Sequence, residues 1–347
     1  MNAKLNIALI SFLAIQSVAT SAFADCKAAF ENQEMRWLTL NGDDYHDRYA
    51  RAMARGLERT LKVRADVKKH SDRVDPTYSV LLDAFPDGTL MASVDLFHHA
   101  TTLWSTDPLP LAKLVENVLT IRSLVHHRLL WVTDPEQEVT DLATLIEIGK
   151  ERPLVVSVDR LGGPAHLSLL AAAMAFGFEV TAVQEDLDIT ARPPKMLIEG
   201  VDFAVRDFKV IEEELERSDL FPILQISGGA RRIDRRLSGV GWIGGKAGIV
   251  ARLHPDNDDK LNLANLAIRM TELGIAIIAS PELSAFHQEC LTQFSGQALS
   301  SSNVKFAGEH YNESIYRIGE ERTLYVLEQL DENKELFKSV IQAATIP

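Results

Sequence analysis

Apolar positions at helical spacing alternate along this chain with short apolar runs. After a run at Trp37–Leu40, apolar residues recur at i, i+3, i+4, i+7 and i+11, namely at Ala50, Met53, Ala54, Leu57 and Leu61. This stripe predicts an amphipathic helix whose apolar face packs on a sheet. The flanking segments, Trp37–Leu40 and Val63–Val67, are typical of strands.

The middle of the chain has the clearest alternation of strand and helix. Leu154–Val158 is a mostly apolar run typical of a buried strand, and a Gly-Gly-Pro loop leads from it into a helix predicted from Ala165 to Phe176. A second strand follows this helix. A strand that feeds a glycine loop and a helix start leaves free backbone N–H groups near the positive end of the helix. The pattern therefore predicts a loop suited to an anionic group on a small ligand.

The same alternation continues on both sides of this unit. Thr140 is predicted to cap a helix over Asp141–Gly149, and the chain from about Leu261 onward is predicted to be mainly helical. Strands alternating with helices indicate an α/β fold with mostly parallel sheets. The further strands are predicted at Thr89–Val94, Leu129–Val132, Gly200–Val205 and Pro222–Ile226.

The first 24 residues have the layout of a cleaved export signal. One positive charge at Lys4 precedes the apolar run Ile7–Ile15, and the small-residue exit Ala22-Phe23-Ala24 follows. We expect cleavage after Ala24 and a periplasmic protein; lipid attachment at Cys26 is the weaker alternative, because the residues before it do not form a lipoprotein-type site. Removing 24 of 347 residues leaves 323, and the loss of Lys4 takes the net charge from −13 to −14. An acidic exported chain is a poor candidate for binding nucleic acid.

A mature chain of this length is long for one core and comfortable for two lobes. We predict a discontinuous first lobe, residues 25–127 and 223–347, and a second lobe, residues 128–222. No low-complexity linker separates them. The chain is therefore expected to cross between the lobes on short ordered segments.

The two cysteines, Cys26 and Cys290, are too few for a disulfide scaffold or a four-cysteine zinc site. In an oxidising compartment they are expected to form one disulfide, with two unpaired thiols as the alternative. The spacings of nucleophile elbows, zinc proteases and calcium loops do not occur in the sequence. The sequence therefore predicts no metal site, no cofactor and no catalytic residues.

Five segments, in the correct order, carry a resemblance to a known family. Asp47–Leu61 resembles a first helix that begins with Asp and has an Ala-Arg pair one turn later, and Phe85–Leu90 is similar to a Pro-Asp-Gly turn before a strand. Val139–Lys150 resembles a Ser-Val-x-Glu-Leu helix. Gly162–Leu167 is similar to a Gly-Ser-Pro-Ser-His-Leu loop, and Leu197–Phe203 to a Leu-x-Gly-Gly-x-Val-Asp segment. Together they resemble the periplasmic solute receptors of tripartite tricarboxylate transporters, the Bug-type receptors.

The resemblance implies a two-lobed type II periplasmic binding fold, each lobe a mostly parallel sheet flanked by helices. It implies a monomer that closes on a carboxylated solute and is recognised by membrane permease subunits. The chain departs from the family in both ligand loops. Gly42–His46 has two aspartates where the family has a Pro-Gly-Gly-Gly-Thr loop, and Val158–Arg160 replaces a Ser-Ser-Gly run.

Candidate ligand-binding residues follow from the rule that open α/β sheets bind ligands at the carboxyl ends of their strands. The alternatives stay open at each place: the loop aspartates are also suited to capping a helix, the glycines to turn geometry alone, and Arg160 to pairing with Asp159 or solvent. The candidates are Asn41, Gly42, Asp43, Asp44, Tyr45, Ser93, Asp95, Asp159, Arg160, Gly162, Gly163, Arg206 and Asp207.

These features predict an extracytoplasmic solute-binding protein rather than an enzyme. The alternatives are a ligand sensor that feeds a signalling receptor, and a periplasmic hydrolase or lyase. Because the candidate residues mix carboxylates with arginines, we expect a small carboxylate solute that also carries amino or hydroxyl groups.

Overall fold

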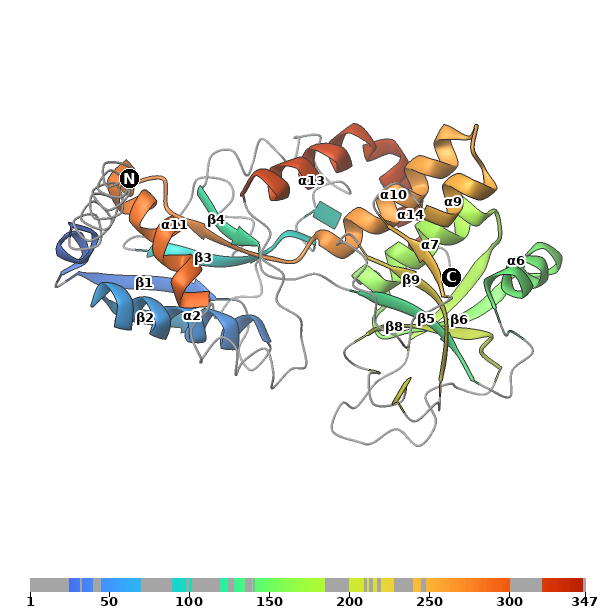
Figure 1. Ribbon diagram of the computed structural model, residues 1–347, viewed down its shortest axis with the longest axis horizontal. Coiled ribbons are helices and arrows are strands. Elements are labelled where there is room, and N and C mark those ends of the chain that lie inside the picture. Colours follow the sequence, from blue (N-terminus) through green and yellow to red (C-terminus); the bar gives the residue numbers. More distant parts are fainter. Residues whose placement is uncertain are drawn as a thin grey trace, which may run out of the picture. The chain divides into compact units, whose positions relative to one another are not determined.

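The computed structural model describes two compact units, which are treated separately below (Figure 1). The first contains the described residues of Met1–Val94, Asn117–Arg122 and Ala276–Tyr311, and the second those of Asp95–Glu116, Ser123–Ile275 and Asn312–Pro347. The described residues are 25–31, 33–39, 45–69, 89–97, 100–101, 119–123, 128–134, 139, 141–184, 200–208, 211, 215–216, 220–227, 240–244, 248–299 and 320–345.

The first unit is built on a five-stranded sheet in the order β2-β1-β3-β11-β4. Strand β1 pairs in parallel with both β2 and β3. Helix α2 (Tyr45–Leu61) packs against α11 (Ala285–Leu299), and the predicted stripe from Ala50 to Leu61 is buried, which confirms the amphipathic helix. The strands are β1 (Glu34–Thr39), β2 (Arg64–Lys69), β3 (Thr89–Asp95), β4 (Leu119–Ser123) and β11 (Ile275–Ala279).

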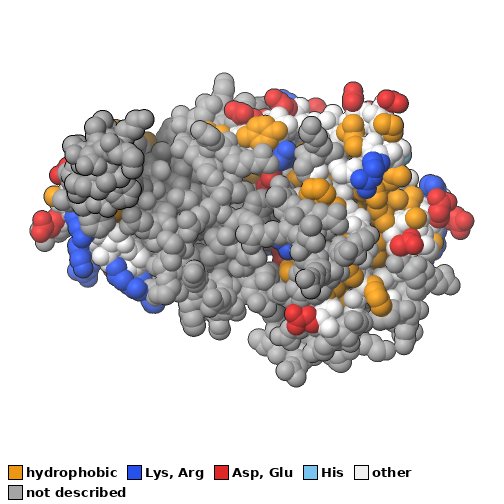
Figure 2. All heavy atoms as spheres, viewed as in Figure 1, with side chains coloured by type: hydrophobic (Ala, Val, Ile, Leu, Met, Phe, Trp, Pro, Cys, Tyr) orange, Lys and Arg blue, Asp and Glu red, His pale blue; other side chains and the backbone are white. Residues whose placement is uncertain are grey.

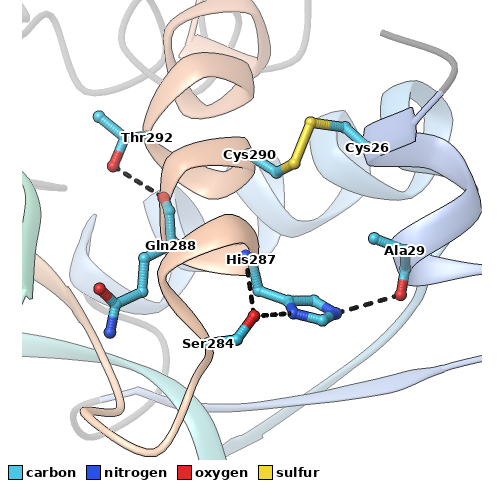
Figure 3. The surroundings of a disulfide bond; sticks show 7 residues. All are labelled: Cys26, Ala29, Ser284, His287, Gln288, Cys290 and Thr292. Carbon is cyan, nitrogen blue, oxygen red and sulfur yellow. Dashed lines mark hydrogen bonds between the residues drawn. A yellow bond between two sulfur atoms is a disulfide. The ribbon is translucent and has the colours of Figure 1, made fainter. Parts of the chain in front are cut away.

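A disulfide joins Cys26, on a short N-terminal helix at residues 25–30, to Cys290 on α11 (Figure 3), which confirms the predicted pairing. His287 supports the same junction. Its Nε2 lies 3.2 Å from the carbonyl oxygen of Ala29, which can only accept, so Nε2 carries the proton. Its Nδ1 lies 2.6 Å from the Ser284 hydroxyl oxygen, within hydrogen-bond distance. The N-terminal helix is thus held to α11 by one covalent bond and one hydrogen-bonded histidine.

The second unit is built on a six-stranded sheet in the order β10-β9-β5-β8-β6-β7. Strand β5 is antiparallel to both of its neighbours, and the β10-β9 and β8-β6-β7 pairings are parallel. The strands are β5 (Leu129–Thr133), β6 (Leu154–Val158), β7 (Val180–Gln184), β8 (Phe203–Asp207), β9 (Phe221–Ile226) and β10 (Gly241–Ile243). The mostly parallel α/β fold predicted from the sequence is therefore observed.

Helix α7 (Pro164–Phe176) is apolar all round because it lies between two layers. It is packed against α10 (Asp258–Glu272), as Figure 1 shows. Beneath it, Trp131 contacts the rings of Phe176, Phe178 and Phe203 at centroid distances of 4.9–6.2 Å. The C-terminal end of α7 therefore packs on an aromatic cluster.

The predicted lobe boundaries are wrong on both sides. The described residues of 223–275 and 312–347 fall in the second unit, not the first, and so do those of 95–116 and 123–127. The reason is pairing: β9 continues the β5 ladder through Ile226, α10 packs on α7, and the C-terminal helix α14 (Lys334–Thr345) also contacts α7. The C-terminal part is also less uniformly helical than predicted, because β11 lies between α10 and α11.

Two smaller features complete the fold. Helix α6 (Leu142–Glu151) is capped by Asp141, whose carboxylate accepts from the N–H of Thr144 at 2.8 Å, so the predicted cap at Thr140 is wrong by one residue. The other described helices are α9 (Gly248–Leu253) and α13 (Glu320–Glu332).

Within the described ranges no helix has the length and apolar character needed to cross a bilayer. On the face drawn in Figure 2, acidic and basic side chains both reach the surface.

Candidate functional site

The register of the second sheet brings several strand ends to one edge. Val158 pairs with Val205 and with Gln184 in parallel ladders. Across the antiparallel strand, Leu129 pairs with Asp207 on one side and Ile226 on the other. The carboxyl ends of β6, β7, β8 and β9 therefore meet the beginning of β5 at one edge, where open α/β sheets bind ligands.

The loop from β6 to α7 forms one corner of this edge, and its backbone is tightly held. The N–H groups of residues 160–163 all donate within the unit. Their acceptors are, in order, the Asp159 carboxylate (2.8 Å), the Gln184 side-chain oxygen (3.1 Å), His166 Nδ1 (2.9 Å) and the Arg160 carbonyl oxygen (3.2 Å). Gly162 has a φ of +74°, a left-handed conformation that glycine adopts without strain.

His166 is the buried anchor of this loop. It lies in the first turn of α7 with 3 % of its surface exposed. Because Nδ1 accepts the Gly162 N–H, that nitrogen is unprotonated and the ring is neutral. Burial lowers the pKa of His166 below its usual 6.5, and the positive end of the helix acts in the same direction. The neutral ring is therefore part of the loop's architecture.

These contacts correct one prediction from the sequence. Free N–H groups were expected in the glycine loop, yet those of residues 160–163 are occupied by local acceptors, because Asp159 and His166 fold back onto the loop. The backbone N–H groups that remain available at this edge belong to the next residues along the chain. Gly163 supplies no side-chain cap and Pro164 has no N–H, so Ala165 and His166 present the backbone N–H groups of the first turn of α7.

The predicted charged residues of this edge differ in exposure. Asp159 and Arg160 are exposed beside the start of α7, and Asp207 is half-buried. Arg206 is 1 % exposed, and its guanidinium donates to the carbonyl oxygens of Ser157 and Val205 at 2.9 Å and to the Ser157 hydroxyl at 2.5 Å. The structure thus brings all four charged residues to one edge. The Arg206 side chain is hydrogen-bonded to β6 at Ser157.

The predicted residues of the first unit are only partly covered. Asn41, Gly42, Asp43 and Asp44 lie outside the described residues. Tyr45 begins α2, and Ser93 and Asp95 lie on β3. The side chains of these three residues lie outside the described part of the structure. Their ligand-binding role stays a prediction.

The sequence interpretation missed a polar cluster at the other side of the edge. Gln225 donates to the Ser227 hydroxyl at 2.9 Å, and the Trp242 indole donates to the same oxygen at 3.4 Å. Gln225 and Ser227 are buried. Ser227 directly follows the predicted strand Pro222–Ile226, so the strand-end rule that selected the other candidates would have found it.

At the described positions, no group of three or more His, Cys, Asp or Glu side chains is arranged to hold a metal ion.

No family model and no curated protein matches the sequence. Solved structures do match over nearly the whole chain. A TctC solute-binding protein from Polaromonas is 12 % identical, with a TM-score of 0.65 over 90 % of this chain and 98 % of that one.

Two further neighbours cover similar lengths. MatC from Rhodopseudomonas palustris, solved with bound malate, is 16 % identical, with a TM-score of 0.52 over 90 % of this chain and 100 % of its own. The periplasmic binding protein BugD is 13 % identical, with a TM-score of 0.53 over 89 % of this chain and 98 % of its own. The chain therefore has the fold of the TctC- and Bug-type solute-binding proteins.

Proposed function

We propose that this protein is a periplasmic solute receptor that binds a small carboxylate and presents it to permease subunits in the membrane. The fold supports a binding protein, and the export signal predicted at residues 1–24 supports the location. The observation that carries the proposal is the edge of the second sheet. There the exposed Arg160 stands beside the uncapped first turn of α7.

Both features favour the same ligand chemistry. A guanidinium binds a carboxylate through two parallel hydrogen bonds, and the N–H groups of Ala165 and His166 at the start of α7 favour an anion. The loop that carries them is fixed by its own hydrogen bonds and by His166. Binding therefore requires little ordering of this loop, which lowers the cost of association.

We also propose that the solute contacts the first unit, at Asn41–Tyr45, Ser93 and Asp95. A solute that contacts both units only in a closed state favours closure by the free energy of those extra contacts. The acidic residues Asp43, Asp44 and Asp95 suit an amino or hydroxyl group on the solute, so we propose an amino- or hydroxy-carboxylate. The chemistry is binding without covalent change, in a monomer without a cofactor.

Isothermal titration calorimetry on the chain from Asp25 tests this proposal. The titrants are malate, glutamate, citrate and adipate, and Arg160→Ala should weaken the best binder by about 1.5–3 kcal/mol, the range for a hydrogen bond to a charged group. Lys150→Ala, on the exposed side of α6, is the matched control and should leave the affinity unchanged. Tight citrate binding that Asp43→Asn and Asp44→Asn leave unaltered would contradict the proposed solute class.

A further inference from the structure

Ser227 lies directly after β9, and its hydroxyl oxygen already accepts two hydrogen bonds. A hydroxyl oxygen has two lone pairs and one hydrogen. With the Gln225 amide oriented as it is, one lone pair receives the Gln225 N–H at 2.9 Å and the other receives the Trp242 indole N–H at 3.4 Å. The Ser227 hydrogen therefore remains as a donor, and among the described residues it has no acceptor.

The residues around Ser227 are built to hold this arrangement. Gln225 is 3 % exposed, and the Ser227 N–H donates to the carbonyl oxygen of Ile243 at 3.2 Å, which fixes the backbone between β9 and β10. The Trp242 indole lies over Gly244, where an added Cβ would come within 2.1–2.5 Å of the ring. Only glycine at position 244 leaves room for the indole in this place.

Positive charge lies one strand away. Ser227 is one residue beyond the last pair of the β5–β9 ladder, Leu129–Ile226, and is thus opposite Arg128. The Phe208 N–H donates to the carbonyl oxygen of Arg128 at 2.7 Å, and the Arg128 guanidinium lies over the Phe208 ring at 5.1 Å. Paired residues of an antiparallel ladder point to the same face of the sheet. Ser227 and Arg128 therefore extend from one face of the sheet, and the Arg128 guanidinium is directed toward Phe208 at the end of β8.

We propose that Ser227, aligned by Gln225 and Trp242, is a second binding point for the solute and takes a carboxylate oxygen. This inference rests on the proposed receptor function and adds to it a subsite on β9, separate from the β6–α7 loop. The subsite selects an acceptor, because the hydroxyl is left with only a hydrogen to offer. Trp242 and Gly244 are positioning residues.

Calorimetry with the same four titrants on the full mature chain tests the subsite. Ser227→Ala should weaken the best binder tenfold or more, as expected for loss of a hydrogen bond to an anion. Ser227→Thr keeps the hydroxyl and should bind within about threefold of the unaltered chain. Ser339→Ala is the matched control, because its hydroxyl donates to the Leu336 carbonyl oxygen within α14. It should bind like the unaltered chain.

Gly244→Ala gives an independent readout, because it displaces the indole without touching Ser227. It should weaken binding and also shift the tryptophan fluorescence, with the far-ultraviolet circular dichroism spectrum unchanged. Should the unaltered chain bind a titrant and Ser227→Ala match it, the subsite is wrong while the receptor function stands. A chain that binds none of the four contradicts both proposals.

Discussion

His166 allows the sharpest physical test of the candidate site, because the loop depends on its neutral ring. His166→Ala removes a buried imidazole and leaves the Gly162 N–H, 2.9 Å from Nδ1, without its acceptor. Truncating a buried side chain of this size costs about 2–3 kcal/mol. Loss of the hydrogen bond adds about 1 kcal/mol, since the loop is partly exposed to water. The free energy of unfolding should fall by about 3–4 kcal/mol in total.

His166→Asn is the matched variant, because its side-chain oxygen can stand near the position of Nδ1. It should lose only about 1–2 kcal/mol, mainly from the smaller volume. Urea denaturation of the second unit, followed by Trp fluorescence, measures both variants. Equal losses for His166→Ala and His166→Asn would contradict the role of Nδ1 as an acceptor.

The pH dependence tests the same contact with a predictable sign. Burial keeps the pKa of folded His166 below the ordinary 6.5. The unfolded chain therefore binds the proton first as the pH falls. The stability that depends on the neutral ring is complete above pH 6.5, declines below it by up to about 1.4 kcal/mol per pH unit, and levels off below the folded pKa. The difference in stability between the unaltered chain and His166→Ala should thus shrink from pH 7.5 to pH 5. A constant difference over this range would refute the reasoning.

Three further predictions concern stability. Lys260 Nζ lies 3.1 Å from the Ala175 carbonyl oxygen at the end of α7, so Lys260→Met should lower the free energy of unfolding by about 1 kcal/mol in urea denaturation, whereas the exposed Lys150→Met should change it by less than about 0.5. Hydrogen bonds from Arg152 and the Val155 N–H, with the Arg152 charge, outweigh burial and hold the pKa of Asp202 below 3.8; Asp202→Asn should cost about 1 kcal/mol at pH 7, and this cost should vanish as the pH falls through that lowered pKa. Reducing the Cys26–Cys290 bond, which closes a loop with a sequence separation of 264 residues, should cost about 2–4 kcal/mol, measured by urea denaturation with and without dithiothreitol.

Local patterns predicted the individual elements well. The strand at Leu154–Val158 matches β6, and the stripe ending at Leu61 forms α2 with a buried apolar face. These elements were accessible because one periodic face, or one continuous apolar run, is fixed by burial alone. The disulfide followed in the same way from the compartment and the count of two cysteines.

Features that depend on long-range pairing were not accessible. The strand β9 was found, but only its ladder to β5 shows that the chain directly beyond residue 222 stays in the second unit. The short strand β11 was hidden because its apolar run IAIIA follows the long helix α10 and reads as its continuation. The register of strand pairing determines which unit such a segment joins, and it cannot be read from a single sequence.

The strand-end positions of several candidate residues were predicted from the sequence, whereas their contacts were not. The strand-end rule placed Asp159, Arg160 and Asp207 at one edge correctly. It could not show that Asp159 and His166 would consume the loop N–H groups, because such contacts depend on side-chain direction. For the same reason Ser227 was overlooked: its chemistry becomes specific only once Gln225 and Trp242 occupy its oxygen.

The proposed receptor function requires that this protein binds and retains a small carboxylate. Native mass spectrometry of the purified mature chain, followed by denaturation and identification of the released small molecule, tests it most directly. We expect one amino- or hydroxy-carboxylate per chain, recovered unaltered after prolonged incubation. A neutral or cationic ligand, no bound ligand even after incubation with malate, glutamate, citrate and adipate, or conversion of the bound carboxylate into a product would contradict it.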